Sequence, residues 1–278
     1  FSYGGMFRNC SSLTSLNISS FNTSKVKQMS NMFSGCSSLV TLDLSNFDTS
    51  NVTAMASMFE KCTSLKNLNL SSFNTSKVIY MDFMFSNCNS IENLNLSSFN
   101  TSKVTNMGNM FTNCYLLKKL DLSSFDTSNV TSMRSTFQNC NSLISLDLSN
   151  FNTSKVTLME EMFRSCHSLL NLNLSGFDTS SVTSTWYMFR DCDKLTELDL
   201  SSFNTSKVTN MNSMFGNCTT LKTIYVSELW DVSNVPSSDS IFYNCQLLAG
   251  AVSYDRTKTD KTMANYTTGY LTYKKNTN

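Results

Sequence analysis

The chain has little of what metal, cofactor and nucleotide sites are made from. Its 278 residues include one histidine, one proline and eight glycines, and only 15% of them are charged. A zinc site needs clustered ligands, and this sequence has no C-x-x-C pair and no second histidine. The glycines form no G-x-G-x-x-G loop that could hold a phosphate. We therefore expect no metal site and no cofactor.

Strong charge of one sign and long apolar runs are also missing. Lysine and arginine total 21 against 20 acidic residues, so no basic field favours nucleic acid. No apolar run reaches the 18 or so residues of a membrane span, and the opening "FSYGGMFRNC" is no signal peptide. It reads instead as the end of an earlier repeat. We expect a monomeric fragment of a longer protein that neither binds nucleic acid nor enters a membrane within these residues, with any anchor outside them.

Candidate catalytic groups are few. His167 follows Cys166, but neighbouring residues in a repeat of this kind face different ways, and a nucleophile must meet its base. Glu160 and Glu161 fit a solvated polar face better than an acid–base pair. The sequence therefore predicts that the protein is not an enzyme.

A period of 26 residues organises the chain. Nine cysteines from Cys10 to Cys218 are each 26 residues apart, and Cys245 follows after 27. The copies share the consensus M-F-x-x-C-x-S-L-x-x-L-x-L-S-x-F-[ND]-T-S-x-V-x-x-M-x-x. A unit that cannot cover its own apolar face must stack on its copies, so the period predicts one elongated array.

Each repeat predicts two kinds of local structure. In "SLTSLNIS", Leu16 and Ile18 alternate inward as a short strand at the spacing of a leucine-rich repeat. In the first full copy, Val26, Met29, Met32, Phe33 and Cys36 recur in steps of three and four, which favours a short helical turn. We predict an α/β solenoid of about nine coils, with a parallel strand on one face and helical turns on the other. Residues 1–226 would form this solenoid, and 227–278 an irregular last repeat and cap.

The regular polar and thiol positions allow more than one interpretation. The cysteines fit a column of buried thiols, although disulfides between adjacent coils are not excluded by distance. The "NTS" sequons at Asn22, Asn74, Asn100, Asn152 and Asn204 match glycan acceptors, but corner-building polar residues explain them better. The threonine column from Thr23 to Thr205 has the regular spacing that an ice-binding surface needs.

Two sets of outward positions are candidates for ligand binding. The first consists of apolar or charged departures from the polar consensus, which include the types that dominate interface hot spots: Tyr80, Phe83, Tyr115, Leu116, Trp186, Tyr187 and Arg190. The second is a polar ribbon along the predicted strands, suited to a glycan or an extended peptide, and includes Asn95, Asp121 and Asp147. Drift on a tolerant surface is the simpler explanation for any single departure.

The repeat unit M-F-x-x-C-x-S-L-x-x-L-D-L-S-x-F-D-T-S-x-V resembles the bacterial surface protein 26-residue repeat family, related to BspA-like leucine-rich repeats. The match covers nearly all of residues 6 to 226, and "GAVSYDRTKTDKTMANYTTGYLTYKK" is similar to the tail that closes such arrays. The resemblance implies a protein on the bacterial cell surface that adheres to a host or extracellular-matrix protein or glycan. No wall-sorting motif or lipoprotein cysteine is present. A structural spacer that displays another domain is the alternative, and ice binding is a third possibility.

Overall fold

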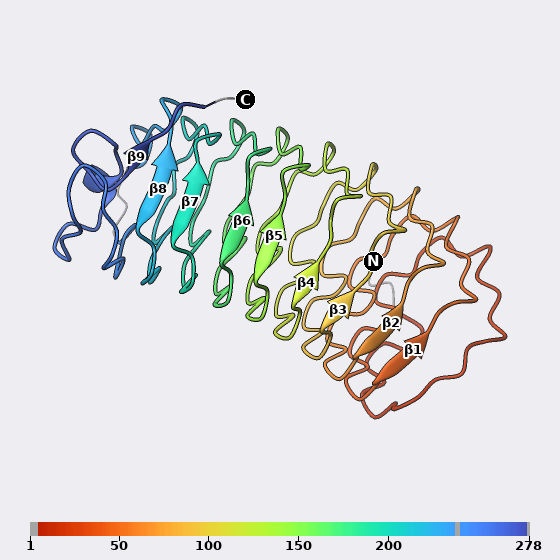
Figure 1. The fold of residues 1–278 in the computed structure, drawn as a ribbon. Coiled ribbons are helices and arrows are strands. Elements are labelled where there is room, and N and C mark those ends of the chain that lie inside the picture. Colours follow the sequence, from red (N-terminus) through yellow and green to blue (C-terminus); the bar gives the residue numbers. More distant parts are fainter. Residues whose placement is uncertain (1–4, 237–239, 277–278) are drawn as a thin grey trace.

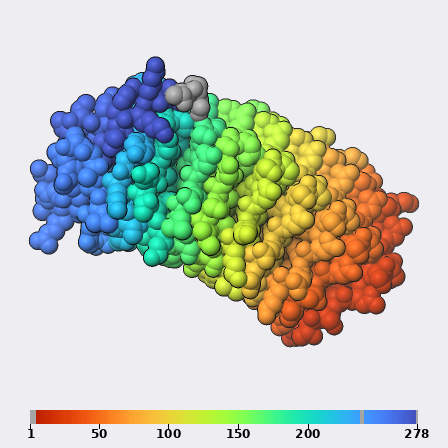
Figure 2. All heavy atoms as spheres, viewed as in Figure 1, coloured from red at the N-terminus to blue at the C-terminus, as the bar shows by residue number. Residues whose placement is uncertain are grey.

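A computed structural model of the chain describes residues 5–236 and 240–276. The chain winds into one elongated, curved stack of coils with a strand on the same side of each successive turn (Figure 1). In the space-filling view the coils form side-by-side ridges, and the C-terminal segment covers one end of the stack (Figure 2). The predicted solenoid is therefore confirmed.

Eight short parallel strands, one per repeat, run along one face of this stack. Pairing is in register, with Leu42 opposite Leu68 and Leu146 opposite Leu172. The strands are β1 (Thr41–Asp43), β2 (Asn67–Asn69), β3 (Asn93–Leu94), β4 (Lys119–Leu120), β5 (Ser145–Asp147), β6 (Asn171–Asn173), β7 (Glu197–Leu200) and β8 (Thr223–Val226). The stack has about seven turns, so the expected nine coils are not confirmed. Among the described residues, the first repeat has no assigned strand at Leu16 and Ile18, contrary to prediction.

The expected helical turns on the opposite face are wrong. In residues 29–36 the chain forms consecutive β-turns, in which Met32 N donates to Met29 O at 3.2 Å and Cys36 N to Phe33 O at 3.1 Å. The third residue of each of these two turns has positive φ, 60° at Asn31 and 77° at Gly35, which an α-helix does not tolerate. Stacked turns place apolar residues three and four apart, as a helix would, and this misled the sequence-based prediction.

Hydrogen bonds between coils explain why these turns do not become helix. The amides of Asn31, Phe33 and Gly35 donate to carbonyls of the next coil, at 3.0, 3.0 and 2.7 Å. A helical amide would instead bond within its own segment. The helical structure in the described part of the chain is one short 3-10 helix, η1 (Lys261–Met263). The fold is therefore a β-solenoid rather than α/β.

Columns of identical side chains form the core. Rings of one column stack nearly parallel, with centroids 5.6 to 5.9 Å apart and planes within 9° of each other. The column contains Phe7, Phe33, Phe59, Phe85, Phe111, Phe137, Phe163, Phe189, Phe215 and Phe242. Columns of leucine, valine and methionine are also buried. Each coil therefore buries its apolar edge against its neighbours, as the period predicts.

The threonine column is part of this interior and cannot contact ice. From Thr23 to Thr205 its members are between 0 and 3% exposed. Thr75 Oγ1 donates to Asn100 O at 2.8 Å and accepts a hydrogen bond from Asn100 N at 2.8 Å. The hydroxyl thus hydrogen-bonds to both backbone groups of one residue in the next coil. The regular spacing of the threonines follows from this structural role. The ice-binding hypothesis is wrong.

The cysteines form a second polar column inside the coils. All ten are free thiols, and all except Cys10 are buried. The Cys62 thiol donates to Phe33 O at 3.2 Å, and the later cysteines repeat this bond to the phenylalanine carbonyl of the preceding coil. Burial raises the pKa of Cys62 and Cys114 to about 12 because the thiolate would lose its hydration. The interpretation as buried thiols is confirmed.

The last described residues fold back onto the final coil. Strand β9 (Thr272–Tyr273) pairs parallel to β8. Tyr270 is fully buried, and its ring meets Phe242 edge-on at 5.4 Å, so it ends the phenylalanine column. Trp230 Nε1 donates to Ala264 O at 3.0 Å. These contacts support our proposal that residues 227–278 act as a cap.

Candidate functional site

The polar ribbon predicted along the strand face is present, but half of its hydrogen-bonding capacity is used locally. One side-chain oxygen of each member accepts a hydrogen bond from the backbone amide two residues later, at 2.9 to 3.1 Å. These amides hold the pKa of Asp43, Asp121 and Asp147 below the usual value, because they stabilise the carboxylate. The ribbon therefore builds the corner after each strand and still presents carboxylates to solvent.

The strand face is interrupted rather than continuous. The strands hydrogen-bond as β1–β2, β3–β4, β5–β6 and β7–β8–β9, which leaves openings between these groups among the described residues. Leu68 in β2 and Leu172 in β6 precede two of the openings and are only partly buried, whereas Leu42 and Leu146 are 3% exposed. At each of these two openings a groove exposes apolar atoms between polar side chains.

The groove at the opening between β6 and β7 has a volume of about 540 Å³. We call it the Tyr225 groove. Leu170 and Leu172 supply its apolar atoms, and Tyr225 of β8 lines it from the other side of β7. Its lining residues are Ser145, Leu146, Asp147, Leu170, Asn171, Leu172, Asn173, Thr196, Glu197, Asp199, Tyr225 and Lys274. It therefore combines an aromatic ring, apolar stems and three carboxylates.

Lys274 reaches into this groove from the C-terminal tail. Its Nζ donates to Asp199 Oδ2 at 2.5 Å and lies 5.4 Å from the centroid of the Tyr225 ring. Burial raises the pKa of Asp199, but hydrogen bonds from Lys274 and Ser201 outweigh this and leave it below the usual value. The same contact raises the pKa of Lys274.

A second groove of about 550 Å³ lies at the opening between β2 and β3. It is lined by Lys66, Asn67, Leu68, Asn69, Ser90, Glu92, Asn93 and Asn95. One of its two charged groups, Glu92, forms an ion pair with Lys118 at 2.7 Å. This groove is therefore more amide-rich and less charged than the Tyr225 groove.

The opposite face, formed by the stacked β-turns, gathers three of the predicted residues into one cluster. The Tyr187 ring stacks on Trp186 with centroids 4.4 Å apart. The guanidinium carbons of Arg164 and Arg190 lie 5.1 and 4.7 Å from the centroid of the same ring. Cation–π contacts of this length are favourable, so they hold the rings of the cluster in place.

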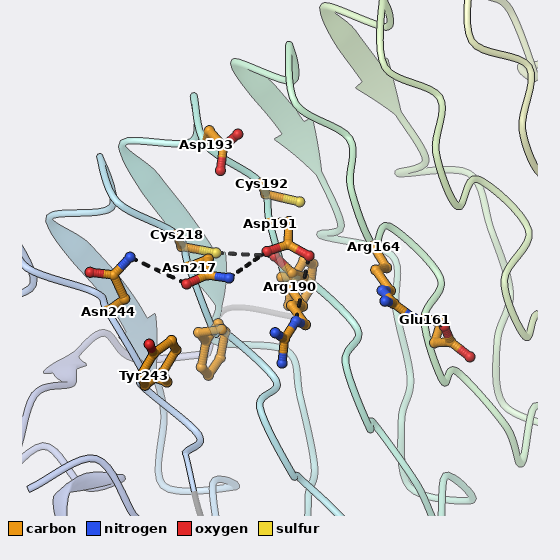
Figure 3. A network of polar contacts seen from close by, with 12 residues as sticks. Glu161, Arg164, Arg190, Asp191, Cys192, Asp193, Asn217, Cys218, Tyr243 and Asn244 are labelled. Carbon is orange, nitrogen blue, oxygen red and sulfur yellow. Dashed lines mark hydrogen bonds and ion pairs between the residues drawn. The ribbon is translucent and has the colours of Figure 1, made fainter.

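Polar contacts extend this cluster in both directions along the stack (Figure 3). Arg190 Nε lies 3.4 Å from Asp191 Oδ2, and Asn217 Nδ2 donates to Asp191 Oδ1 at 2.7 Å. On the other side, Arg164 and Gln138 both donate to Glu161 Oε2, at 2.6 and 2.8 Å. Glu161 is thus a buried ion-pair acceptor, not the solvated residue that the sequence suggested.

Bulky residues occupy a strained backbone position on this turn face. Phe83, Glu161 and Tyr187 have φ of 57°, 56° and 57°, in a position that Asn31 or Ser57 fills in other coils. Left-handed φ suits asparagine and is unfavourable for a large side chain. These three departures from the consensus therefore carry a conformational cost that asparagine would reduce.

The remaining predicted residues do not join a common site. Tyr80 and Phe83 are 51 and 38% exposed on the turn face, and Tyr115 and Leu116 are 37 and 44% exposed one coil later. Asn95 lines the second groove and Asp147 the Tyr225 groove, while Asp121 lines neither.

Sequence reasoning missed Tyr225, Glu197 and Lys274 as candidates. Tyr225 had a readable signal, because it replaces the asparagine or aspartate of every earlier strand. Lys274 had no such signal in the sequence, because 75 residues separate it from Asp199.

Two further observations concern metals and membranes. Within residues 5–236 and 240–276, no group of three or more histidine, cysteine or acidic side chains is placed to hold a metal ion. Over the same ranges no helix has the length and apolarity needed to span a bilayer.

His167 contacts Asp193 at 2.7 Å on the surface, while Cys166 is buried.

The coils, strand face and buried columns define a leucine-rich-repeat-like solenoid. Overlapping matches at residues 2–120, 90–197, 138–255 and 169–278 together assign residues 2–278 to one family. The chain belongs to the family described as "Mycoplasma protein of unknown function, DUF285", and the resemblance to BspA-like repeats is confirmed. A search of the curated proteins gives no match.

Solved structures with related coils share little sequence with this chain. A chain of the Toll–Spätzle complex of Drosophila is 16% identical, with a TM-score of 0.39 over 73% of this chain and 29% of that chain. A leucine-rich repeat protein from Bacteroides ovatus is 18% identical, with a TM-score of 0.23 over 83 and 84%. The functional domain of InlJ from Listeria monocytogenes, which includes a cysteine ladder, is 18% identical, with a TM-score of 0.24 over 86 and 55%. This chain thus spans less than a third of the Toll-complex chain.

Proposed function

We propose that this protein is a non-enzymatic binding scaffold of the bacterial cell surface that recognises a host or matrix protein or glycan through its solenoid. The observation that carries the proposal is the Tyr225 groove, which joins apolar, aromatic and charged groups on the strand face. Binding sites typically have this composition, an apolar lining with a few placed polar groups. In-register stacking of the coils holds the lining residues at fixed spacing.

The turn-face cluster around Tyr187 is the second place where a partner could bind. Tryptophan, tyrosine and arginine are the residue types most enriched in interface hot spots. Trp186, Tyr187 and Arg190 supply all three within one coil. Tyr187 occupies a strained position, and its contacts with Trp186, Arg164 and Arg190 offset that cost and present the ring in a fixed orientation to a partner.

A structural spacer is the alternative function, and the unbroken phenylalanine column favours it. Ten rings, from Phe7 to Phe242, stack in register along the rod, and regular packing of this kind suits a spacer. A spacer has no use for a groove or for strained aromatic residues, so loss of these features should leave it unaffected.

An array of extracellular-matrix proteins and glycans tests these functions with three proteins. The first is the unchanged chain, the second carries Tyr225→Asn, and the third carries Trp186→Asn and Tyr187→Ser. Each replacement restores a residue found in that position of another coil, so folding should be retained. We expect the unchanged chain to bind at least one array component and Tyr225→Asn to bind it less. An array on which the unchanged chain gives no signal would favour the spacer.

A further inference from the structure

We propose that the Tyr225 groove binds a lysine side chain of a partner polypeptide, and that Lys274 occupies this place in the free protein. This inference rests on the proposed binding function and specifies the ligand. Its basis is a contact within the molecule itself: an ammonium group already lies in the groove, over an aromatic ring and against a carboxylate.

Charge is the first argument. The whole chain has a formal net charge of +1, yet the groove holds Asp147, Glu197 and Asp199 against the single cation of Lys274. Among the described residues only Asp199 of these three carboxylates forms an ion pair. The groove therefore keeps a local excess of negative charge in a protein that is otherwise balanced, and it is complementary to a cation.

Shape and apolar surface are the second argument. A lysine side chain has a four-carbon stem and a compact charged head, and the stem packs on apolar surface while the head remains hydrated. Leu170, which is 48% exposed, and partly buried Leu172 supply apolar surface beside the carboxylates. Tyr225 adds a ring face, which attracts an ammonium group. A neutral carbohydrate could stack on the ring and donate hydroxyl hydrogen bonds to the carboxylates, but it carries no positive charge to balance them.

The backbone of Lys274 is fixed beside β8, where its amide donates to Val226 O at 2.8 Å, but its side chain is weakly held and can be displaced. Strand β9 has only two residues, paired to Tyr225 and Val226. The Lys274 and Asp199 side chains are 50 and 44% exposed, and exposed ion pairs of this kind contribute little. A partner lysine that engages Asp199 and Glu197 of the same strand could therefore replace the tail lysine, with Asp147 adding to the negative charge of the groove. Lys274 would then act as a competitor built into the chain.

The experiment is a titration of the full chain, labelled at leucine methyl groups, with the peptide acetyl-Gly-Lys-Gly-Lys-Gly-amide followed by NMR. We expect saturable shifts at Leu170 and Leu172. A matched peptide with norleucine in place of lysine keeps the stem and lacks the charge, so it should bind at least tenfold more weakly. Equal binding of the two peptides would overturn the proposal.

Changes in peptide affinity in three variants test whether Lys274 competes for the groove. Lys274→Gln removes the cation from Asp199 while keeping a polar side chain, so peptide affinity should rise by up to about fivefold, the upper value of an exposed ion pair. Asp147→Asn with Glu197→Gln should lower it about tenfold. Lys275→Ala is the matched control, since it removes the neighbouring lysine outside the groove, and should change nothing. Unchanged affinity in Lys274→Gln, with an unchanged melting curve, would show that the tail does not compete.

The same variants on the array separate this inference from the proposed function. If the unchanged chain binds a matrix protein and Asp147→Asn with Glu197→Gln binds it equally well, the lysine site is wrong while the scaffold function stands. If the chain bound only neutral glycans, the lysine site would likewise be wrong and the scaffold function would stand. A blank array for both the unchanged chain and Lys274→Gln would reject the scaffold function itself.

Discussion

Alkaline pH should unfold this solenoid through its cysteine column. Burial raises the pKa of Cys62, Cys114, Cys166 and Cys245 from 9.0 to about 12, because the thiolate would lie in an apolar interior. The folded form is therefore favoured while the thiols are protonated. This stabilisation is complete below pH 9 and is lost as the pH rises from 9 toward 12, since the unfolded chain then releases protons that the folded chain retains.

The magnitude follows from the size of these shifts. At pH 10 a thiol with a pKa of 9.0 in the unfolded chain and about 12 in the folded chain loses about 1.4 kcal/mol, so four lose about 6 kcal/mol. Typical unfolding free energies are about 5 to 15 kcal/mol. The loss is therefore large enough to unfold the chain.

Urea denaturation followed by far-ultraviolet circular dichroism, in reducing buffer from about pH 7.5 to 10.5, measures this loss. A variant with Cys114→Ala and Cys166→Ala is the control, and its loss between pH 8 and 10 should be about 3 kcal/mol smaller than that of the unchanged chain. Equal losses in the two proteins would refute the assignment of the pH dependence to buried thiols.

Three further predictions concern the columns of the core. A thiol reagent at pH 8 should modify about one cysteine of the folded chain, the exposed Cys10, and all ten in denaturant; rapid reaction of more than two would contradict the burial of the column. Thr75→Val should lower the unfolding free energy by about 2 kcal/mol, because both backbone groups of Asn100 lose their partner, while Thr75→Ser should recover most of it. Phe137→Ala should cost about 3 to 5 kcal/mol and Phe137→Leu clearly less in the same assay, because leucine fills part of the space of the ring; a cost of under about 1 kcal/mol for Phe137→Ala would contradict the packing of this column.

The sequence predicted the columns correctly where burial alone decides the residue. Cys62 recurs as Cys88 and Cys114 because each coil offers the same small cavity and the same carbonyl to bond. The sequence-based prediction was wrong where the same spacing of apolar residues can arise from two different backbone structures, a helix or a series of β-turns. Met29, Met32 and Cys36 recur at helical intervals, but the positive φ of Asn31 and Gly35 makes the segment a series of turns. No periodicity in apolar residues distinguishes these two arrangements.

The candidate site was only partly predictable for a related reason. Trp186, Tyr187 and Arg190 are close in sequence and stand out from the consensus, so their contact could be expected. By contrast, the sequence predicts a solvated Glu161, because it does not show that Arg164 and Gln138 both donate hydrogen bonds to this carboxylate.

What the sequence alone determined is the stack itself: a 26-residue period, with apolar residues at fixed positions, can bury its surface only against its own copies. The tertiary structure decided where that stack opens. Strand pairing stops between β6 and β7, the tail returns beside β8, and Lys274 comes to rest on Asp199. These features depend on how strands pair and how the end of the chain folds back. Both are set by contacts between distant residues, and a repeated local pattern does not encode them.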